Sequence, residues 1–293
     1  MDAVTLGRQT AALPWTEAAR YSLRRIQREQ RKQRKLVRRE ERQARRLEQR
    51  AARMERCVLR QQRRETRQAL RLERREARRE LARKRNEPPL LSHQEEVINA
   101  ASHGAGALLA LWGMVLLLGR SHTALARTAS LFYGVSMVLM MLMSCIYHAM
   151  PARSRAKRVC RRFDYTSIYL LIGGTFAPIL LLYVGGTLGL VLFRVQWGII
   201  LAGVSLVLAF GPGRWRGLLF TLYFALGWSG LAFIPSFCRN ARPLLWFILT
   251  GGLVYTLGMV PFARKRKYDH CVWHLFVLAA AALHWAGIYT QLY

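Results

Sequence analysis

The chain has 293 residues, of which 52% are hydrophobic, and a formal net charge of +30. Its five cysteines are an odd number, which argues against a disulfide framework. The charge is unevenly spread, because residues 1–90 hold 29 Lys and Arg against 12 acids, whereas residues 91–293 hold 17 against 4. The composition therefore describes two different halves, a basic arm and an apolar region poor in acids.

The first half is predicted to be a basic arm over residues 1–90. No Gly or Pro occurs between Trp15 and Glu87, and the residues that dominate the segment, Arg, Gln, Glu, Ala and Leu, favour helices. We expect a long arm, helical or partly disordered, that ends at Pro88-Pro89. Its apolar positions do not sustain a heptad, which disfavours a stable coiled coil. Three interpretations stay open: a solvated charged arm, binding to anionic lipid, or binding to RNA or a protein partner.

Apolar stretches follow, each near the roughly 20 residues that a membrane-spanning helix needs. The first runs from about Val97 to before Arg120, and the last covers 271–293. Between them lie 128–147, 217–238 and 243–263, and two further spans come from 165–193 and 195–213, with a division at residues 183–186. The sequence therefore predicts an all-α bundle of seven transmembrane helices over residues 95–293, in an integral multi-pass membrane protein.

The basic residues of the short loops predict the orientation of this bundle. If the arm is cytoplasmic, the inner loops 150–163, 211–216 and 264–269 hold 12 Lys and Arg, whereas the outer ends and loops hold 5. We therefore expect the N-terminus in the cytoplasm and the C-terminus outside. In this topology the second span ends, and the first, third and seventh spans begin, at the same depth.

Polar residues gather at that depth. Residues His270 and His274 are four apart on the seventh helix, so both imidazoles lie on one face and can share a metal ion. His148 ends the second span, with Ser144 one turn deeper, and Asp164 begins the third. Ionisable groups cost a few kcal/mol, roughly 2.5–3.5 at a helix centre for Asp, so they are usually functional or paired.

Other interpretations of the individual residues stay open. The histidines could be packing or interfacial residues, Asp269 could cap its helix, and Asp164 could cap a helix or pair with Arg161 or Arg162. The residue after His270 is Cys271 and not Glu, so the metalloprotease motif with its own general base is absent. Taken together, the set favours a metal site. The remaining histidines, His93, His122 and His284, are not expected to be ligands.

A set of segments carries a recognisable pattern: Glu96-Val97-Ile98-Asn99 with His103, Ser144 with His148, Arg162-Phe163-Asp164, Gly174-Thr175-Phe176-Ala177-Pro178, Gly227-Trp228, Gly251-Gly252-Leu253-Val254-Tyr255-Thr256-Leu257-Gly258, and His270 with His274. This pattern resembles the haemolysin III and progestin and adipoQ receptor family of seven-helix membrane proteins. The matching segments keep the family's order and cover roughly residues 95–293, whereas the arm has no counterpart.

The resemblance implies that His148, His270 and His274 bind zinc and that Asp164 approaches the ion through a water. It places Ser144 beside the site. Further residues would line or brace it: Glu96, Asn99 and His103. Family members have been regarded as receptors, as haemolysins and as relatives of ceramidase-type hydrolases, so the resemblance leaves the activity open.

A tetrahedral zinc with three imidazole ligands keeps one position open, as catalytic zinc does, whereas structural zinc has four protein ligands. Asp164 could then hold a water and take its proton, and Ser144 could steady the oxyanion. The leading hypothesis is a zinc-dependent hydrolase of lipid amide or ester bonds, similar to a ceramidase, that takes membrane lipids at the inner leaflet. The alternatives are a membrane receptor with a structural zinc and a haemolysin-type pore.

Overall fold

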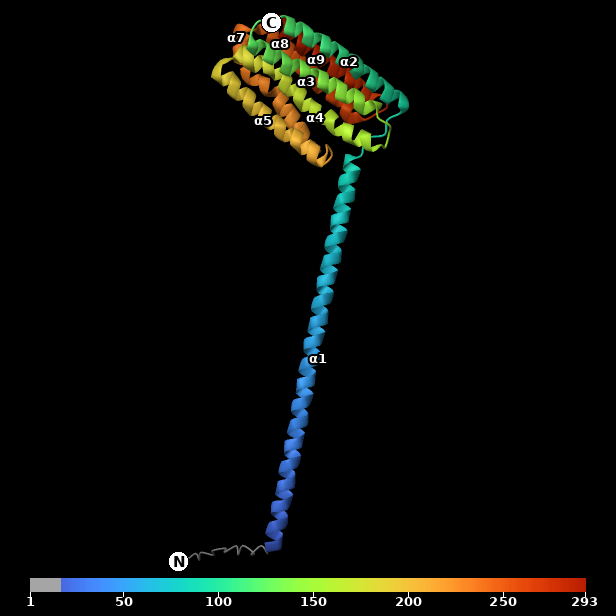
Figure 1. Cartoon of the computed structure of the whole chain (residues 1–293), viewed down its shortest axis with the longest axis vertical. Coiled ribbons are helices and arrows are strands. Elements are labelled where there is room, and N and C mark those ends of the chain that lie inside the picture. Colours follow the sequence, from blue (N-terminus) through green and yellow to red (C-terminus); the bar gives the residue numbers. More distant parts are fainter. Residues whose placement is uncertain (1–16) are drawn as a thin grey trace, which may run out of the picture. The chain divides into compact units, whose positions relative to one another are not determined.

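The computed structural model describes residues 17–293, and all the secondary-structure elements of these residues are helices (Figure 1). The first 16 residues of the predicted arm lie outside the described residues. The chain divides into two compact units after Ala77. The first long helix, α1 (Glu17–Asn86), contains 70 residues and ends two residues before Pro88, so the arm is helical over its described part.

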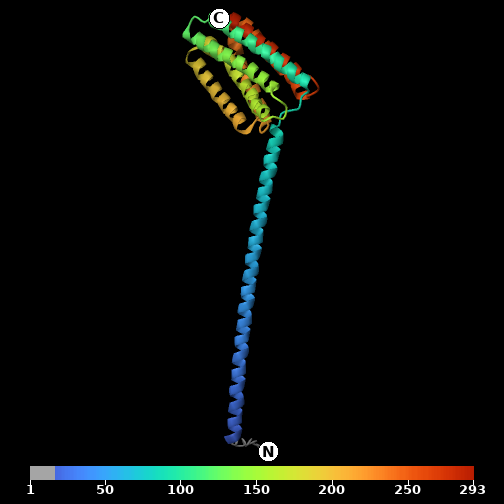
Figure 2. The same ribbon diagram turned by 45° about the vertical axis from the view of Figure 1, so that its right-hand side comes forward.

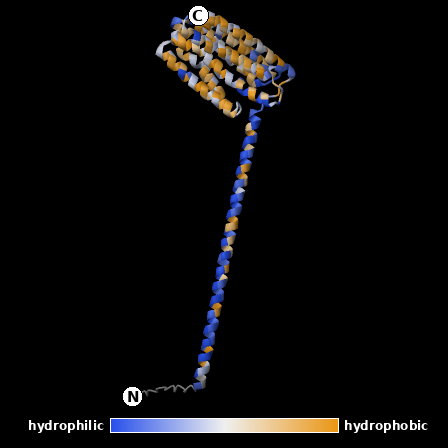
Figure 3. Cartoon of the chain, in the orientation of Figure 1, coloured by the Kyte–Doolittle hydropathy of each residue, from blue (hydrophilic) through white to orange (hydrophobic). Residues whose placement is uncertain are grey.

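The side chains of Glu17 and of residues 20–80 are exposed, apart from that of Ala52. Helix α1 is therefore stabilised mainly by the helix propensities of its own residues and not by packing. Glu80 and Lys84 have the expected spacing of four residues, and their charged groups lie 2.9 Å apart. Hydrophilic residues predominate along α1, with isolated hydrophobic ones, whereas hydrophobic residues predominate in the remaining helices (Figure 3).

The second unit contains seven helical spans, as predicted. Two of them contain another helical turn: the π-helical turn η1 extends the span of α4 after Pro178, and the 3₁₀ turn η2 joins α6 to α7. The bounds are α2 (His93–Gly119), α3 (Ala124–Ala149), α4 (Arg155–Pro178), η1 (Ile179–Val184), α5 (Gly186–Phe210), α6 (Arg216–Gly227), η2 (Trp228–Phe233), α7 (Ile234–Asn240), α8 (Arg242–Arg264) and α9 (Asp269–Leu292).

Two boundaries differ from the prediction. The first span begins at His93 and not near Val97, because Ser92 and Glu95 form a capping box that starts the helix earlier. The predicted inner loop 150–163 is mostly helix, since α4 begins at Arg155, where the Ser154 hydroxyl accepts the Lys157 N–H at 2.9 Å. Basic residues assigned to a loop therefore form the first two turns of α4. The predicted break at 183–186 is confirmed, with Gly185 at φ 64°.

The packing order brings α2, α3, α4 and α9 together in the bundle, whose arrangement can be followed from a second side in Figure 2. Helix α3 packs between α2 and α4, and α9 packs against both α2 and α8. Helix α4 with η1 is the most buried of the seven spans. The starts of α2, α4 and α9 and the end of α3 therefore meet, as the orientation of the predicted spans requires.

Close contact between α3 and α4 depends on Gly174. A Cβ added there would lie 2.5 Å from the Ser136 Cβ and 2.9 Å from the backbone oxygen of Phe132, which cannot easily move. We therefore expect Gly174→Ala to lower the free energy of unfolding in detergent by about 1–3 kcal/mol. Gly198→Ala is the matched control, because a Cβ there meets no atom within 4 Å. That variant should be neutral or more stable by up to about 1 kcal/mol; equal effects would contradict the packing argument.

Candidate metal centre

Three histidines from two helices form a cluster that could hold a metal ion. His148 belongs to the last turn of α3, whereas His270 and His274 lie one turn apart in α9. One ligand nitrogen of each lies within 4.8 Å of the others. His148 and His274 are buried, and His270 is partly exposed. The sequence predicted these three residues as ligands, and the structure brings them together.

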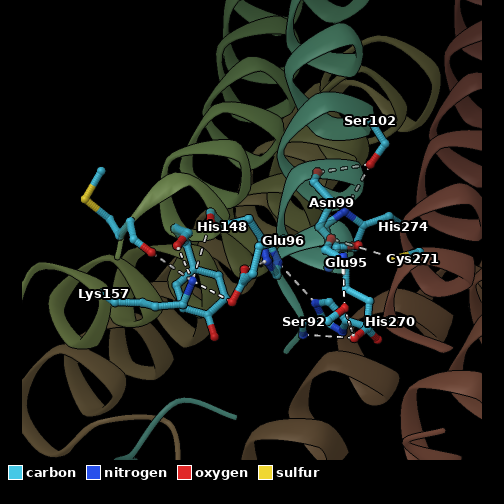
Figure 4. Close-up of polar contacts among 12 residues, drawn as sticks. Ser92, Glu95, Glu96, Asn99, Ser102, His148, Lys157, His270, Cys271 and His274 are labelled. Carbon is cyan, nitrogen blue, oxygen red and sulfur yellow. Dashed lines mark hydrogen bonds and ion pairs between the residues drawn. The ribbon is translucent and has the colours of Figure 1, made fainter. Parts of the chain in front are cut away.

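The orientation of the His148 ring follows from its contact with Glu96 (Figure 4). The His148 Nδ1 lies 2.8 Å from a carboxylate oxygen of Glu96. An ionised carboxylate only accepts hydrogen bonds, so Nδ1 carries the proton and donates it. In the neutral ring, Nε2 then keeps its lone pair and faces the cluster, where it lies 3.2 Å from the His270 Nε2. A carboxylate behind a ligating histidine is the usual way to orient such a ring.

His274 is oriented in a similar way by α2. The Ser102 hydroxyl donates its proton to the backbone oxygen of Asn99 at 3.0 Å. Its oxygen is therefore the acceptor in the 3.4 Å contact with the His274 Nδ1, which leaves the Nε2 lone pair of that ring free. One face of the ring is covered by His103, whose ring stacks on it at a centroid distance of 3.7 Å.

The distance between two of the ligand atoms matches that of a small tetrahedral cation, and all three atoms lie within 4.8 Å of one another. With metal–nitrogen bonds of about 2.0–2.1 Å, two ligand nitrogens of a tetrahedral site lie about 3.3 Å apart. The His148 and His270 Nε2 atoms, at 3.2 Å, match this spacing. Further buried polar atoms nearby, the side-chain amide of Asn99 and both ring nitrogens of His103, have no partner among the described residues. Because buried polar groups are normally satisfied, these atoms could serve as partners of an additional polar species at the centre.

The structure also places the two predicted catalytic residues beside the cluster. Ser144 is buried one turn before His148, and the Asp164 carboxylate is close enough to Ser144, His148 and Arg161 to interact with each of them. No ion pair joins Asp164 to Arg161 or Arg162 in the part of the chain that the structure describes. The Arg161 guanidinium instead donates its hydrogen bonds to the backbone oxygens of Asn86 and Glu87, and that of Arg162 donates to Leu208.

The sequence analysis missed Lys157, a fully buried lysine that was assigned to an inner loop. Its ammonium lies 2.7 Å from the second carboxylate oxygen of Glu96, the residue that holds His148. The same group donates to the backbone oxygens of Tyr147, His148 and Met150 at the end of α3. Lys157 precedes Asp164 by seven residues, two turns of a helix, which was the available signal that it faces the site.

The start of α9 is fixed by acids that do not contact the histidine cluster directly. The Glu95 carboxylate accepts the backbone N–H of Tyr268 at 2.8 Å, and Tyr268 has a left-handed backbone, with φ 64°. Asp269 is not the N-cap that the sequence allowed, since Tyr268 takes that position. Its carboxylate instead accepts two hydrogen bonds from Arg264, at 2.6 and 3.0 Å. The first contact holds the start of α9, and therefore His270, against α2, and the second holds it against the end of α8.

The fold and the centre define a class of protein: an integral multi-pass membrane protein of seven helices with a three-histidine cluster at one end of its bundle. Comparison with known sequences identifies the group within this class. The sequence profile of the family described as Haemolysin-III related matches residues 91–285, about two thirds of the chain. The chain belongs to this family, and the match leaves the arm outside.

Relatives of known name support this assignment. Hemolysin-3 of Bacillus cereus is 32% identical over 195 residues, which cover 65% of this chain and 88% of the relative. The Hemolysin-3 homolog of Bacillus subtilis is 30% identical over 194 residues, 64% of this chain and 90% of the relative. The human Monocyte to macrophage differentiation factor is 28% identical over 207 residues, which cover 68% of this chain and 85% of the relative. The relationship predicted from the sequence is therefore confirmed.

Proposed function

We propose that the chain is a zinc-dependent hydrolase of lipid amide or ester bonds, with chemistry like that of a ceramidase. The observation that carries the proposal is the set of three imidazoles, of which His148 and His274 present unprotonated Nε2 atoms. A set of three histidines suits zinc with one open position, the arrangement of catalytic and not of structural zinc. When bound, zinc would polarise the substrate carbonyl and make a water nucleophilic near neutral pH.

The roles of the protein's own residues follow from their positions. Asp164, beside Ser144, would accept a proton from the attacking water and return it to the departing amine or alcohol. The Ser144 hydroxyl would donate a hydrogen bond either to this carboxylate or to the developing oxyanion. Glu96 would hold the His148 ring in place. Water and the amide are then converted into a carboxylic acid and an amine, with the proton transfers balanced through Asp164.

The surroundings of the centre support a lipid substrate. The centre lies among helices that are long and apolar enough to cross a membrane, near the ends of their spans. A headgroup linkage of a membrane lipid reaches that depth, and His270 is the partly exposed member of the cluster. With the cytoplasmic orientation that the loop charges favour, the lipid would come from the inner leaflet.

The test is release of fatty acid from a panel of ceramides and ester lipids by the purified full-length chain. Wild type is expected to release fatty acid, and His270→Ala to release none above the background without enzyme, because two histidines cannot hold the ion in the same geometry. A His270→Ala protein as active as wild type would refute the proposal.

A receptor is the second candidate, favoured by one relative. The Adiponectin receptor protein of Drosophila melanogaster is 25% identical over 223 residues, which cover 66% of this chain and 50% of that protein. In this case the metal would brace the helices and no lipid would be cleaved. A wild-type protein that holds zinc and releases no fatty acid from any lipid of the panel would favour this candidate.

A further inference from the structure

The charged residues of α1 are sorted onto opposite sides of the helix. With 3.6 residues per turn, successive residues are rotated by about 100°. On this basis every Lys and Arg of residues 20–79 falls on one half of the circumference, here named the basic face. Every Glu of residues 29–80 falls on the other half, together with large apolar residues such as Ile26, Val37 and Val58. All the Lys and Arg side chains of this stretch are exposed.

This arrangement leaves the basic face without neutralising partners. Oppositely charged residues three or four apart normally pair along an exposed helix. Among the described residues of α1, only two such ion pairs occur, between Glu29 and Lys32 and between Glu80 and Lys84. The second of these uses a lysine beyond the basic face. A row of cations along most of a 70-residue helix is therefore free to bind an external anion.

The geometry points to the anionic lipid headgroups of the membrane in which the seven-helix unit lies as the partner of the basic face. A helix that is basic on one side only matches a flat anionic surface, whereas a helix inserted in a nucleic-acid groove has phosphates on both sides. The glutamates on the opposite side would be repelled by a polyanion that surrounded the helix. Charge complementarity thus selects both the partner and the side that faces it.

Two further observations favour lipid over single-stranded RNA. Binding of single strands relies on aromatic side chains that stack with bases, and no Phe, Tyr or Trp occurs in residues 22–87. Only the six residues 87–92 separate α1 from the first span, so headgroups are present at a high effective concentration. Large apolar residues lie mainly on the opposite side, so binding through the basic face should be electrostatic and reversed by salt.

Cys57 allows a direct test, because it lies on the basic face and is exposed. In full-length protein with Cys145, Cys160 and Cys238 replaced by Ala, a fluorophore on Cys57 would report contact with a quencher attached to lipid headgroups. Cys271 is buried and should not react. The matched control carries Cys57→Ser and Thr66→Cys, which moves the label to the opposite side of α1, nine residues away.

In nanodiscs containing phosphatidylglycerol, the Cys57 label should be quenched at least about fivefold more than in neutral nanodiscs, and about 1 M salt should remove the difference. The label at position 66 should respond much less. Equal quenching at both positions, or equal quenching in neutral and anionic nanodiscs, would overturn the proposal. Saturable binding of a mixed-sequence RNA by the neutral nanodiscs, without any lipid-dependent quenching, would also overturn it and assign the basic face to nucleic acid.

Charge variants show whether the lipid-dependent quenching comes from the basic face or from any change in the charge of α1. Replacing Arg53, Arg60, Arg64 and Arg67 by Gln keeps good helix formers and should lower the lipid-dependent quenching severalfold. Replacing Glu48, Glu55, Glu73 and Glu76 by Gln alters the opposite face to the same extent and should not lower it. A loss of quenching in the second variant but not in the first would contradict the assignment. Neither variant touches the histidine cluster.

Discussion

Replacing His148 and His274 together by Ala should reduce the bound zinc of the purified protein from about one ion per chain to none. The double variant removes the two rings whose Nε2 lone pairs are set up by Glu96 and Ser102, and it leaves His270 alone. A single imidazole on a helix binds divalent zinc far too weakly to survive purification. Metal content measured by plasma mass spectrometry on detergent-purified protein gives the result without any assay of activity.

The control for this experiment is Asp164→Asn, which keeps all three imidazoles and nearly the same side-chain volume. We expect this variant to retain the metal, since Asp164 is not among the residues whose ligand atoms cluster within 4.8 Å. Thermal unfolding curves of both variants show whether the bundle is intact. Zinc at the wild-type level in the double variant would show that the cluster is not the binding site, and wild-type protein without zinc would remove the basis of the proposed function.

Lys157→Met should weaken metal binding by about 10–100-fold, because Lys157 holds the carboxylate that orients His148. It should also lower the free energy of unfolding by about 3–5 kcal/mol, the usual cost of removing one partner of a buried ion pair. Side-chain exposure is 2% for Lys157 and 14% for Glu96, so water cannot replace the missing ammonium fully. The backbone oxygens at the end of α3 lose a donor as well.

The same substitution at Lys84 provides the comparison. Lys84 pairs with Glu80 at 2.9 Å, but the two side chains are 73% and 66% exposed, and exposed pairs contribute about 0–1 kcal/mol. Zinc titration and thermal unfolding of both variants measure the two effects separately. If Lys157→Met lost stability but kept wild-type affinity for zinc, the lysine would brace the bundle without positioning His148.

The sequence predicted the depth of the site in the membrane, but not which helices lie side by side around it. Hydropathy and loop charge place each residue along one direction, the membrane normal, which is why His148 and the His270 and His274 pair could be expected at one level. Which helices lie side by side is set by packing, and no periodicity predicts that Ser102 of α2 faces His274 of α9. The contact depends on the close approach of α2 and α9.

Lys157 was missed for a related reason. A charged residue next to an apolar run is most simply interpreted as loop, and the positive-inside rule counts it in that way. Its burial depends on Glu96, which lies far away in sequence on another helix, and on the carbonyl groups that end α3. In the sequence, only the spacing of seven residues between Lys157 and Asp164 indicated that both face the site. This spacing is informative only once α4 is known to begin at Arg155, so that both residues belong to one helix.

The direction of the helices around the centre has an electrical consequence. Helices α2, α4 and α9 begin there, whereas α3 ends there and α8 ends beside the start of α9. Each helix start carries about half a positive elementary charge and each end about half a negative one, so three starts and two ends leave about half a positive charge from the backbone at the centre. The only four acids of residues 91–293, Glu95, Glu96, Asp164 and Asp269, all lie in the same place. Glu96 and Asp269 are paired with Lys157 and Arg264, so the four acids exceed these two cations by two charges. This excess offsets the backbone field and favours a cation beside the three imidazoles.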